Sequence, residues 1–164
     1  MGLLQNLDID EFFLIDPYEE YNECKEVKSN ANKMTDAQKE AHERLDGYSN
    51  LSWIEKYSDK AISEINRELD YVYIDGNHHH EYVKRYIENY YSLLKVNEIL
   101  AGDDVNWMGV SRAVMEFAYR KELQPHFEPK HEDWFFVKGR NIDAKKPLPY
   151  TVEADLTENQ RHSI

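Results

Sequence analysis

Short apolar runs recur along the chain, and most of them stop at acidic residues, glycine or proline, as buried strands of a parallel sheet do where they reach a loop. Strands are therefore expected at residues 11–16, 51–57, 69–75, 98–101, 126–127 and 134–138. The run LDYVYID at residues 69–75 is the clearest, because β-branched and aromatic residues dominate it and Asp75 and Gly76 end it. The last two runs enclose a polar turn whose length suits an antiparallel hairpin.

Between the strands, apolar residues return every three or four positions, which predicts helices at residues 58–69, 81–94 and 109–122. A more polar helix is expected in the second half of residues 22–45, with Thr35 and Gln38 as its capping box. The alternation of strands and helices predicts an α/β fold. We expect one open, mostly parallel sheet with right-handed crossovers and an antiparallel hairpin at its C-terminal edge.

Length and composition suit a single globular domain. The chain has 164 residues, of which 41% are hydrophobic, so it can bury one core. We place the domain over residues 1–139 and assign residues 140–164 to a polar extension that carries prolines and lacks a core pattern. Cys24 is the only cysteine, which excludes an internal disulfide and a site with several thiolate ligands.

The charge narrows the expected partners. A formal net charge of −12 repels a phosphate backbone, and no Lys/Arg-rich run offsets it, so nucleic acid is not an expected partner. No stretch of about 18 apolar residues is available for a membrane span, and the N-terminus does not read as a signal peptide. We therefore expect no membrane partner, a cytoplasmic location and a small-molecule substrate. The tyrosine-rich helix over residues 82–91 has two interpretations, core packing or a homo-oligomer contact.

Acidic residues stand at the ends of three expected strands: Asp16, Asp75, and the pair Asp103 and Asp104. In open α/β sheets, ligands bind outside the carboxyl ends of the strands, so we expect these carboxylates to line one site. The structural alternatives are a loop-capping role for Asp16 ahead of Pro17 and solvated acids at the other positions.

Residues 71–118 resemble the second half of class I S-adenosylmethionine-dependent methyltransferases. The family's IDG-x-H, GGILAGHDY and GV-x-x-AV-x-x-F motifs correspond here to Ile74, Asp75, Gly76, His78, Val83, Ile99 to Asp104, Gly109, Val110, Ala113, Val114 and Phe117. LIDPYEEY resembles the family's second strand, and WFFVKG resembles its last strand. The resemblance implies a Rossmann-like sheet and S-adenosylmethionine as the cofactor.

One departure from the family pattern is large. The family's first strand ends in an acid and a G-x-G turn, whereas no two glycines of this chain are separated by one residue. That strand would lie between residues 11–16 and 69–75, so its loss is expected to leave unpaired backbone groups on both neighbours. A late start, a strand from another chain and a differently closed sheet are the alternatives, of which truncation is favoured by the helix-like N-terminus.

The resemblance also implies roles for the cofactor-binding residues. Asp16 corresponds to the acid that holds the ribose hydroxyls, and Asp75 lies at the neighbouring strand end. Tyr57, Ser58 and Asp59 follow the strand whose loop contacts adenine in the family. A helix-capping role explains Ser58 equally well.

Asp75, Asp103 and Asp104 are similar to the metal triad of cation-dependent O-methyltransferases, and three oxygen ligands with room for water suit Mg²⁺. A metal there would place Asp75 in catalysis by lowering the pKa of a substrate hydroxyl. Many relatives have histidine at the position of Asp103 and work without metal, so both forms stay open.

His78 corresponds to the family histidine and is the candidate general base, with a loop hydrogen bond as the alternative. His79 and His80 are expected to be solvated. Trp107 and Met108 either wall a substrate pocket or belong to the core or a lid.

These expectations lead to three candidate functions. The first is methylation of a hydroxyl on a small molecule or sugar, with or without Mg²⁺. The second is a truncated or degenerate methyltransferase-like protein that acts as an interaction domain without activity. The third, a metal-dependent hydrolase using Asp75, His78, Asp103 and Asp104, is disfavoured because these residues already match the methyltransferase pattern.

Overall fold

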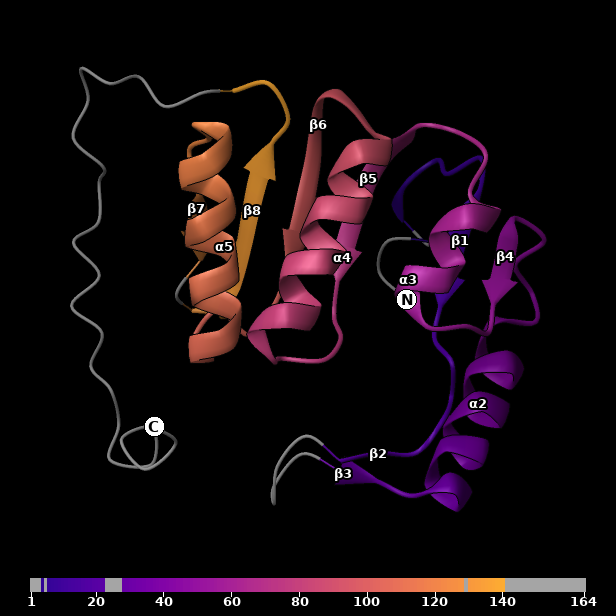
Figure 1. Ribbon diagram of the computed structural model, residues 1–164. Helices are drawn as coiled ribbons and strands as arrows, with labels where there is room; N and C mark the ends of the chain where they lie inside the picture. The colour runs from indigo at the N-terminus through magenta and orange to yellow at the C-terminus, as the bar shows by residue number, and fades with distance from the viewer. Residues whose placement is uncertain (1–3, 5, 23–27, 129, 141–164) are drawn as a thin grey trace.

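The computed structural model describes residues 4, 6–22, 28–128 and 130–140. Its strands are β1 (Phe12–Ile15), β2 (Tyr21–Asn22), β3 (Lys28–Ser29), β4 (Leu51–Ile54), β5 (Leu69–Ile74), β6 (Leu94–Gly102), β7 (His126–Glu128) and β8 (Asp133–Val137). Its helices are α2 (Ala31–Leu45), α3 (Ser58–Ala61), α4 (His80–Leu93) and α5 (Met108–Lys121), with a 3₁₀ turn at Ile62–Glu64 (Figure 1). The expected α/β class is confirmed. The extension predicted beyond Gly139 lies outside the described residues, apart from Arg140.

The larger sheet has four strands in the order β5-β6-β8-β7. β5 and β6 are parallel, whereas β8 is antiparallel to both β6 and β7. This confirms the C-terminal hairpin at the edge. The expectation of one open sheet is corrected, because among the described residues β1 pairs in parallel with β4 alone and forms a separate two-stranded sheet.

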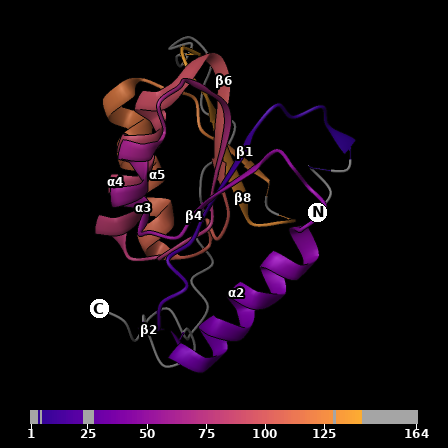
Figure 2. The same ribbon diagram turned by 90° about the vertical axis from the view of Figure 1, so that its right-hand side faces the viewer.

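The helices α3, α4 and α5 lie on one side of the four-stranded sheet (Figure 2). The largest fully buried side chains lie between these helices and the sheet, and they include Trp134, Phe117, Phe136, Ile87, Leu94 and Leu100. Burial of each such side chain contributes roughly 1.5–3 kcal/mol to stability. The apolar spacing that predicted α4 and α5 is therefore the spacing of their buried faces.

The tyrosines of α4 serve mainly in packing. Tyr86 and Tyr90 are buried, and Tyr91 meets Phe117 edge to face with ring centroids 5.0 Å apart. Tyr82 is the exposed member at 43%. Core packing, one of the two interpretations of this helix, therefore describes most of its aromatic face.

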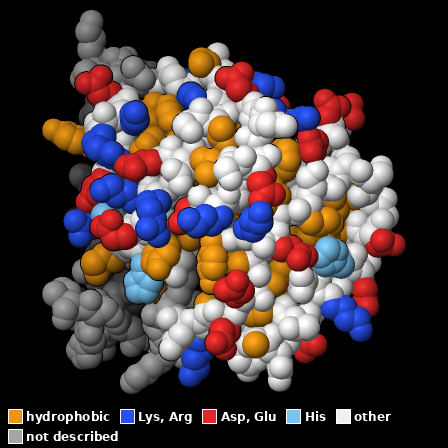
Figure 3. Space-filling view, turned by 45° about the vertical axis from the view of Figure 1, so that its right-hand side comes forward, with side chains coloured by type: hydrophobic (Ala, Val, Ile, Leu, Met, Phe, Trp, Pro, Cys, Tyr) orange, Lys and Arg blue, Asp and Glu red, His pale blue; other side chains and the backbone are white. Residues whose placement is uncertain are grey.

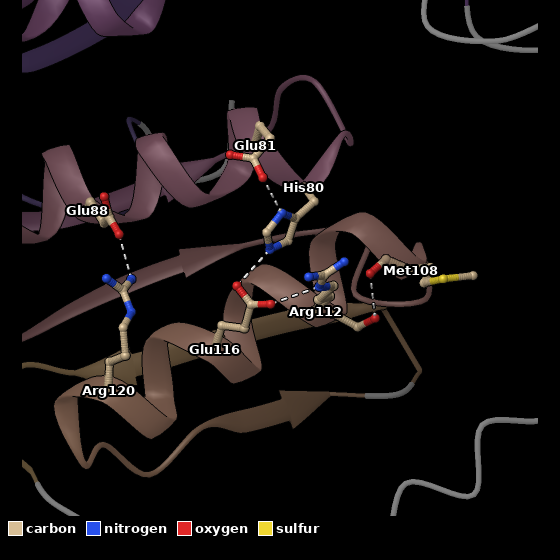
Figure 4. Close-up of polar contacts among 8 residues, drawn as sticks. His80, Glu81, Glu88, Met108, Arg112, Glu116 and Arg120 are labelled. Atoms are coloured by element: carbon tan, nitrogen blue, oxygen red, sulfur yellow. Dashed lines mark hydrogen bonds and ion pairs between the residues drawn. The ribbon is translucent and has the colours of Figure 1, made fainter. Parts of the chain in front are cut away.

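Polar contacts join α4 to α5 along their exposed sides (Figure 4). His80 Nε2 lies 2.8 Å from Glu116 Oε2, and Arg112 donates to the other oxygen of Glu116. Arg120 donates to Glu88 across the same helix pair. The expectation that His80 is simply solvated is corrected, since its side chain is 16% exposed and is held between Glu116 and Glu81.

The start of α2 also differs from the prediction. Asn30 accepts the backbone N–H of Lys33 at 3.0 Å and caps the helix. The capping box at Thr35 is wrong, because Thr35 is already inside the helix and its hydroxyl donates to the carbonyl of Ala31. Asn30 is as good a cap as threonine, and the earlier cap adds a turn to the helix.

The helix expected over residues 58–69 is shorter than predicted. α3 ends at Ala61 and the following 3₁₀ turn ends at Glu64, after which Ile65 adopts an extended conformation. Leu69 then opens β5 instead of closing a helix. The apolar residues at helical spacing are thus divided among α3, the 3₁₀ turn and β5, although Ala61 and Ile65 are both buried in the core.

None of the helices in the described part of the chain has the length and apolar character needed to cross a membrane. The face seen in Figure 3 mixes Lys and Arg with Asp and Glu side chains, and apolar side chains show between them. Charge of both signs is therefore distributed over this surface.

Candidate functional site

The structure places the four predicted acids directly after three strands that run in the same direction in Figure 1. Asp16 follows β1, Asp75 follows β5, and Asp103 and Asp104 follow β6. Their charges act on one another. Desolvation raises the pKa of Asp75, and the negative charges of Asp104 and Asp16 raise it further. The two separate sheets therefore contribute to a common acidic rim.

Asp103 is the most perturbed of these acids. Desolvation raises its pKa to about 6, with added repulsion from Asp75 and Asp104. Close carboxylates resist simultaneous ionisation, so this rim favours a proton, a hydrogen-bond donor or a cation.

We expect the free energy of unfolding to fall as the pH rises through Asp103's titration. An unfolded aspartate has a pKa of about 3.9, so the folded state binds the proton more tightly and ionisation favours unfolding. Asp103→Asn should be more stable than the native chain by about 1 kcal/mol near pH 7, after allowance for solvent screening, and equally stable near pH 4. Urea unfolding at both pH values measures this. Asp36→Asn, an exposed change on α2, controls for net charge; an equal gain at both pH values would contradict the mechanism.

His78 is held by two neighbours. Its Nε2 lies 2.7 Å from Asp104 Oδ2, and its ring stacks on Trp107 with centroids 4.8 Å apart. Asp104 has a φ of 56°, a left-handed conformation that aspartate tolerates better than most residues. A carboxylate that orients an imidazole is the arrangement expected around a general base. The sequence identified both residues but not this pairing.

Gly109 allows the start of α5 to approach the loop that carries His78. A Cβ at Gly109 would lie 2.2 Å from the carbonyl oxygen of His78 and 2.9 Å from the backbone nitrogen of His80. Only glycine fits such a close backbone approach. The glycine of the GV-x-x-AV motif therefore sets the position of the histidine loop.

Trp134 supports the turn that carries Asp103 and Asp104. Its indole N–H donates to the carbonyl of Asp103 at 3.1 Å, and its side chain is 1% exposed. A Cβ at Gly102 would meet the ring of Trp134 and the carbonyl oxygen of Ile74 at 2.6 Å. Close packing beneath the turn therefore fixes the two acids relative to β5.

The predicted adenine-contact residues lie at the start of α3. Tyr57 precedes the helix and its hydroxyl donates to Glu19 at 2.7 Å, a contact that sequence reasoning missed because 38 positions separate the two residues. The Ser58 carbonyl accepts from the hydroxyl of Tyr90 at 2.9 Å. Helix capping by the Ser58 side chain is wrong, since the N-cap position is Tyr57 and no side-chain cap bond forms. Asp59 lies in the first turn of α3.

Asp16 makes the loop-capping contact that was predicted as the alternative to a ligand-binding role. Its Oδ1 accepts the backbone N–H of Tyr18 at 2.7 Å. This bond uses one carboxylate oxygen and fixes the side chain at the end of β1. A carboxylate has lone pairs for further donors, so loop capping and ligand binding are compatible.

The predicted Mg²⁺ site has less geometric support than the pairing of His78 with Asp104. Among the described residues, no group of three or more His, Cys, Asp or Glu side chains is placed to hold a metal ion. Asp104 is engaged by His78 in this arrangement, so a metal would compete with that hydrogen bond. Asp75, Asp103 and Asp104 therefore stay a predicted triad.

A groove of about 1190 Å³ runs between the two sheets and ends at this rim. Residues from β1 and β5 line its length, and Ser58, Asp75 and Gly76 line the end beside the acids. Ligand pockets usually measure about 300–1,000 Å³, so the groove is large enough for a nucleoside-bearing cofactor.

An α/β sheet with acids and a histidine at the carboxyl ends of its parallel strands defines a Rossmann-like protein with a ligand site at that edge. A family model described as a methyltransferase domain matches residues 2–105. The chain belongs to this family, and its fold is that of the class I S-adenosylmethionine-dependent methyltransferases.

Solved structures show the same fold at low sequence identity. The O-methyltransferase NovP has a TM-score of 0.58 at 11% identity, with 79% of this chain and 60% of that chain covered. The O-methyltransferase TomG from Streptomyces achromogenes, solved with SAM, has a TM-score of 0.56 at 13% identity, with 84% and 66% covered. CalS11, a TDP-rhamnose 3'-O-methyltransferase, has a TM-score of 0.51 at 15% identity, with 79% and 59% covered.

The chain thus spans about 60% of the length of NovP. No curated protein sequence matches it.

Proposed function

We propose that this protein binds S-adenosylmethionine at the acidic rim and directs methyl transfer to a hydroxyl group of a small molecule or sugar. The observation that carries the proposal is the pairing of His78 with Asp104, whose Nε2 and Oδ2 atoms lie 2.7 Å apart. Both residues lie in loops that follow strands, as Asp16 and Asp75 do. The O-methyltransferases with the same fold support the reaction class.

Asp16 would hold the ribose hydroxyls, because its carboxylate is fixed by Tyr18 at the end of β1 and can accept further hydrogen bonds. Tyr57, Ser58 and Asp59 would border the adenine from the start of α3. Asp75 follows β5 in the loop that also carries His78, and its carboxylate would orient donors of the cofactor or the acceptor hydroxyl. When bound, the cofactor supplies the methyl group from its sulfonium centre.

His78 would act as the general base. It would accept the proton of the acceptor hydroxyl as that oxygen takes up the methyl group. Asp104 would stabilise the imidazolium and hold its ring, and stacking on Trp107 would limit rotation. This role uses only neighbours that the fold already positions.

A magnesium-assisted form is the second version of the same proposal. Repulsion among Asp75, Asp103 and Asp104 supports it, because a bound cation would relieve the repulsion. In that form Asp75 and its neighbours would bind Mg²⁺, which would lower the pKa of the acceptor hydroxyl.

A binding role without catalysis is the second candidate function. The division of the sheet between β1 and β5 favours it, since β1 and β5 belong to separate sheets within the described residues. Such a protein would act as an interaction domain. Cofactor binding discriminates between the two candidates.

Titration calorimetry with S-adenosylhomocysteine, with and without Mg²⁺, tests the proposal. We expect binding to the native chain, and at least about tenfold weaker binding to Asp16→Asn, because a hydrogen bond to a charged group contributes about 1.5–3 kcal/mol. Asp36→Asn, which changes an exposed acid on α2, should bind as the native chain does. Absence of heat in both conditions would reject cofactor binding, and a thermal shift with Mg²⁺ that survives Asp75→Ala and Asp104→Ala would reject these residues as metal ligands.

A further inference from the structure

His80 is the first residue of α4 and lies two positions after the candidate base His78. Carboxylates flank both of its ring nitrogens. Nδ1 lies 3.0 Å from Glu81 Oε1, and Nε2 lies 2.8 Å from Glu116 Oε2. The side chain is only 16% exposed, so both polar atoms of a partly buried ring have partners. These contacts hold the imidazole in one orientation between α4 and α5.

Glu116 belongs to α5 and is fixed by the preceding turn of that helix. Arg112 Nε donates to Glu116 Oε1 at 2.8 Å, whereas the other oxygen, Oε2, is the one beside His80 (Figure 4). The hydrogen bond from Arg112 lowers the pKa of Glu116, and the one with His80 lowers it further. Glu116 is thus held as a carboxylate, and hydrogen bonds with an ionised group are stronger than those between neutral groups.

The backbone of the loop that carries His78 touches α5 at a second point. Gly109 lies in the first turn of α5, where a Cβ would come within 2.2 Å of the His78 carbonyl oxygen and 2.9 Å of the His80 nitrogen. The contact between His80 and Glu116 lies about two turns further along the same helix. Two separated contacts fix both the distance and the angle between the start of α4 and α5, which a single contact does not.

The start of α5 also carries the two groups that contact the His78 ring. Trp107 is the N-cap residue of α5, and its ring stacks on that of His78 with centroids 4.8 Å apart. The backbone N–H of Trp107 donates to the carbonyl of Asp104 at 2.9 Å, so the acid that lies beside His78 Nε2 is tied to the same helix end. The position of the His78 ring between these neighbours therefore depends on how the start of α4 sits on α5.

We infer that His80 and Glu116 are positioning residues for His78. Their contact fixes the start of α4 on α5 and thereby holds the His78 ring against Asp104 and Trp107. The effect on methyl transfer rests on the proposed role of His78 as the general base. Loss of the contact would then lower kcat more than it raises KM, because a displaced base slows the chemical step. The positioning itself is a property of the chain alone and is measurable without cofactor or acceptor.

NMR of the histidine side chains in the full chain, at one fixed pH and without cofactor, tests this inference. Protons above the face of an aromatic ring resonate upfield, so the difference in His78 ring shifts between the native chain and Trp107→Leu measures the stacking. We expect His80→Ala and Glu116→Ala each to lose most of that upfield shift. His80→Gln should keep most of it, because glutamine offers Glu116 an amide N–H donor. If His80→Ala does not fold, Arg112→Ala decides, since it releases Glu116 at the helix surface: a partial loss supports the inference, and none overturns it.

Glu88→Ala is the matched control, because it removes the ion pair with Arg120 that also joins α4 to α5 (Figure 4). It should keep the native His78 shifts, and an equal loss there would overturn the inference. The methyl signals of Leu100, which is fully buried, report on the fold in every variant. Native His78 shifts in a folded His80→Ala would show that the contact contributes to stability alone, which also overturns the inference. Calorimetry with S-adenosylhomocysteine is a separate measurement, so its failure would reject cofactor binding and leave the NMR result unchanged.

Discussion

Gly109→Ala is expected to lower the free energy of unfolding by about 3 kcal/mol, the upper end of the range for overpacked sites. The added Cβ would lie 2.2 Å from the His78 carbonyl oxygen and 2.9 Å from the His80 nitrogen. Both are backbone atoms, so the loop or the start of α5 has to move. The gain in helix propensity from alanine, at most about 1 kcal/mol, does not offset this. Urea unfolding followed by circular dichroism measures the change.

Gly47→Ala is the matched control, because a Cβ there meets nothing within 4 Å. We expect its free energy of unfolding to stay within about 0.5 kcal/mol of that of the native chain. If Gly109→Ala were equally mild, the close approach between α5 and the histidine loop would be wrong. The substitution also bears on function, since movement of the loop would separate His78 from Asp104.

Trp134→Ala is expected to lower the free energy of unfolding by about 3–5 kcal/mol, the range for loss of a large buried aromatic residue. Trp134 is 1% exposed and packs against Phe136 with ring centroids 5.6 Å apart. Its loss would leave a cavity under the turn of Asp103 and Asp104 and remove the hydrogen bond to the Asp103 carbonyl. Denaturant unfolding monitored by far-UV circular dichroism gives the value.

Tyr119→Ala is the control for this change, because Tyr119 is 86% exposed. Its substitution should lower the free energy of unfolding by no more than about 0.5 kcal/mol. Trp134→Phe should fall between the two, since it retains most of the packing but lacks the indole N–H. A Trp134→Ala variant as stable as Tyr119→Ala would show that the sheet does not pack as described.

The sequence predicted the elements with a strong apolar period. β5, α4 and α5 begin and end near their predicted limits because their apolar residues face a single core. Gly76 marks the end of β5, and Gly109 marks the start of α5. β6 is longer than predicted, starting at Leu94 instead of at Glu98. Leu94 is buried, but the next residues, Lys95 to Asn97, are polar or exposed, so the local pattern does not distinguish them from a loop.

The short β2–β3 hairpin was not predicted. Its two residue pairs, Tyr21 with Ser29 and Asn22 with Lys28, carry no apolar alternation. Capping of α2 by Asn30 was likewise missed in favour of Thr35, because both sites satisfy the local rule for a cap.

The sequence by itself determined the α/β alternation and the acids and glycines that end the strands, because these depend on local periodicity and on which residues tolerate a turn. Only the tertiary structure decided that Asp104 holds His78, that Tyr57 bonds Glu19 and that a groove separates β1 from β5. Each of these depends on the distance between segments far apart in the chain. Such distances follow from the packing of the whole core, which no local pattern specifies.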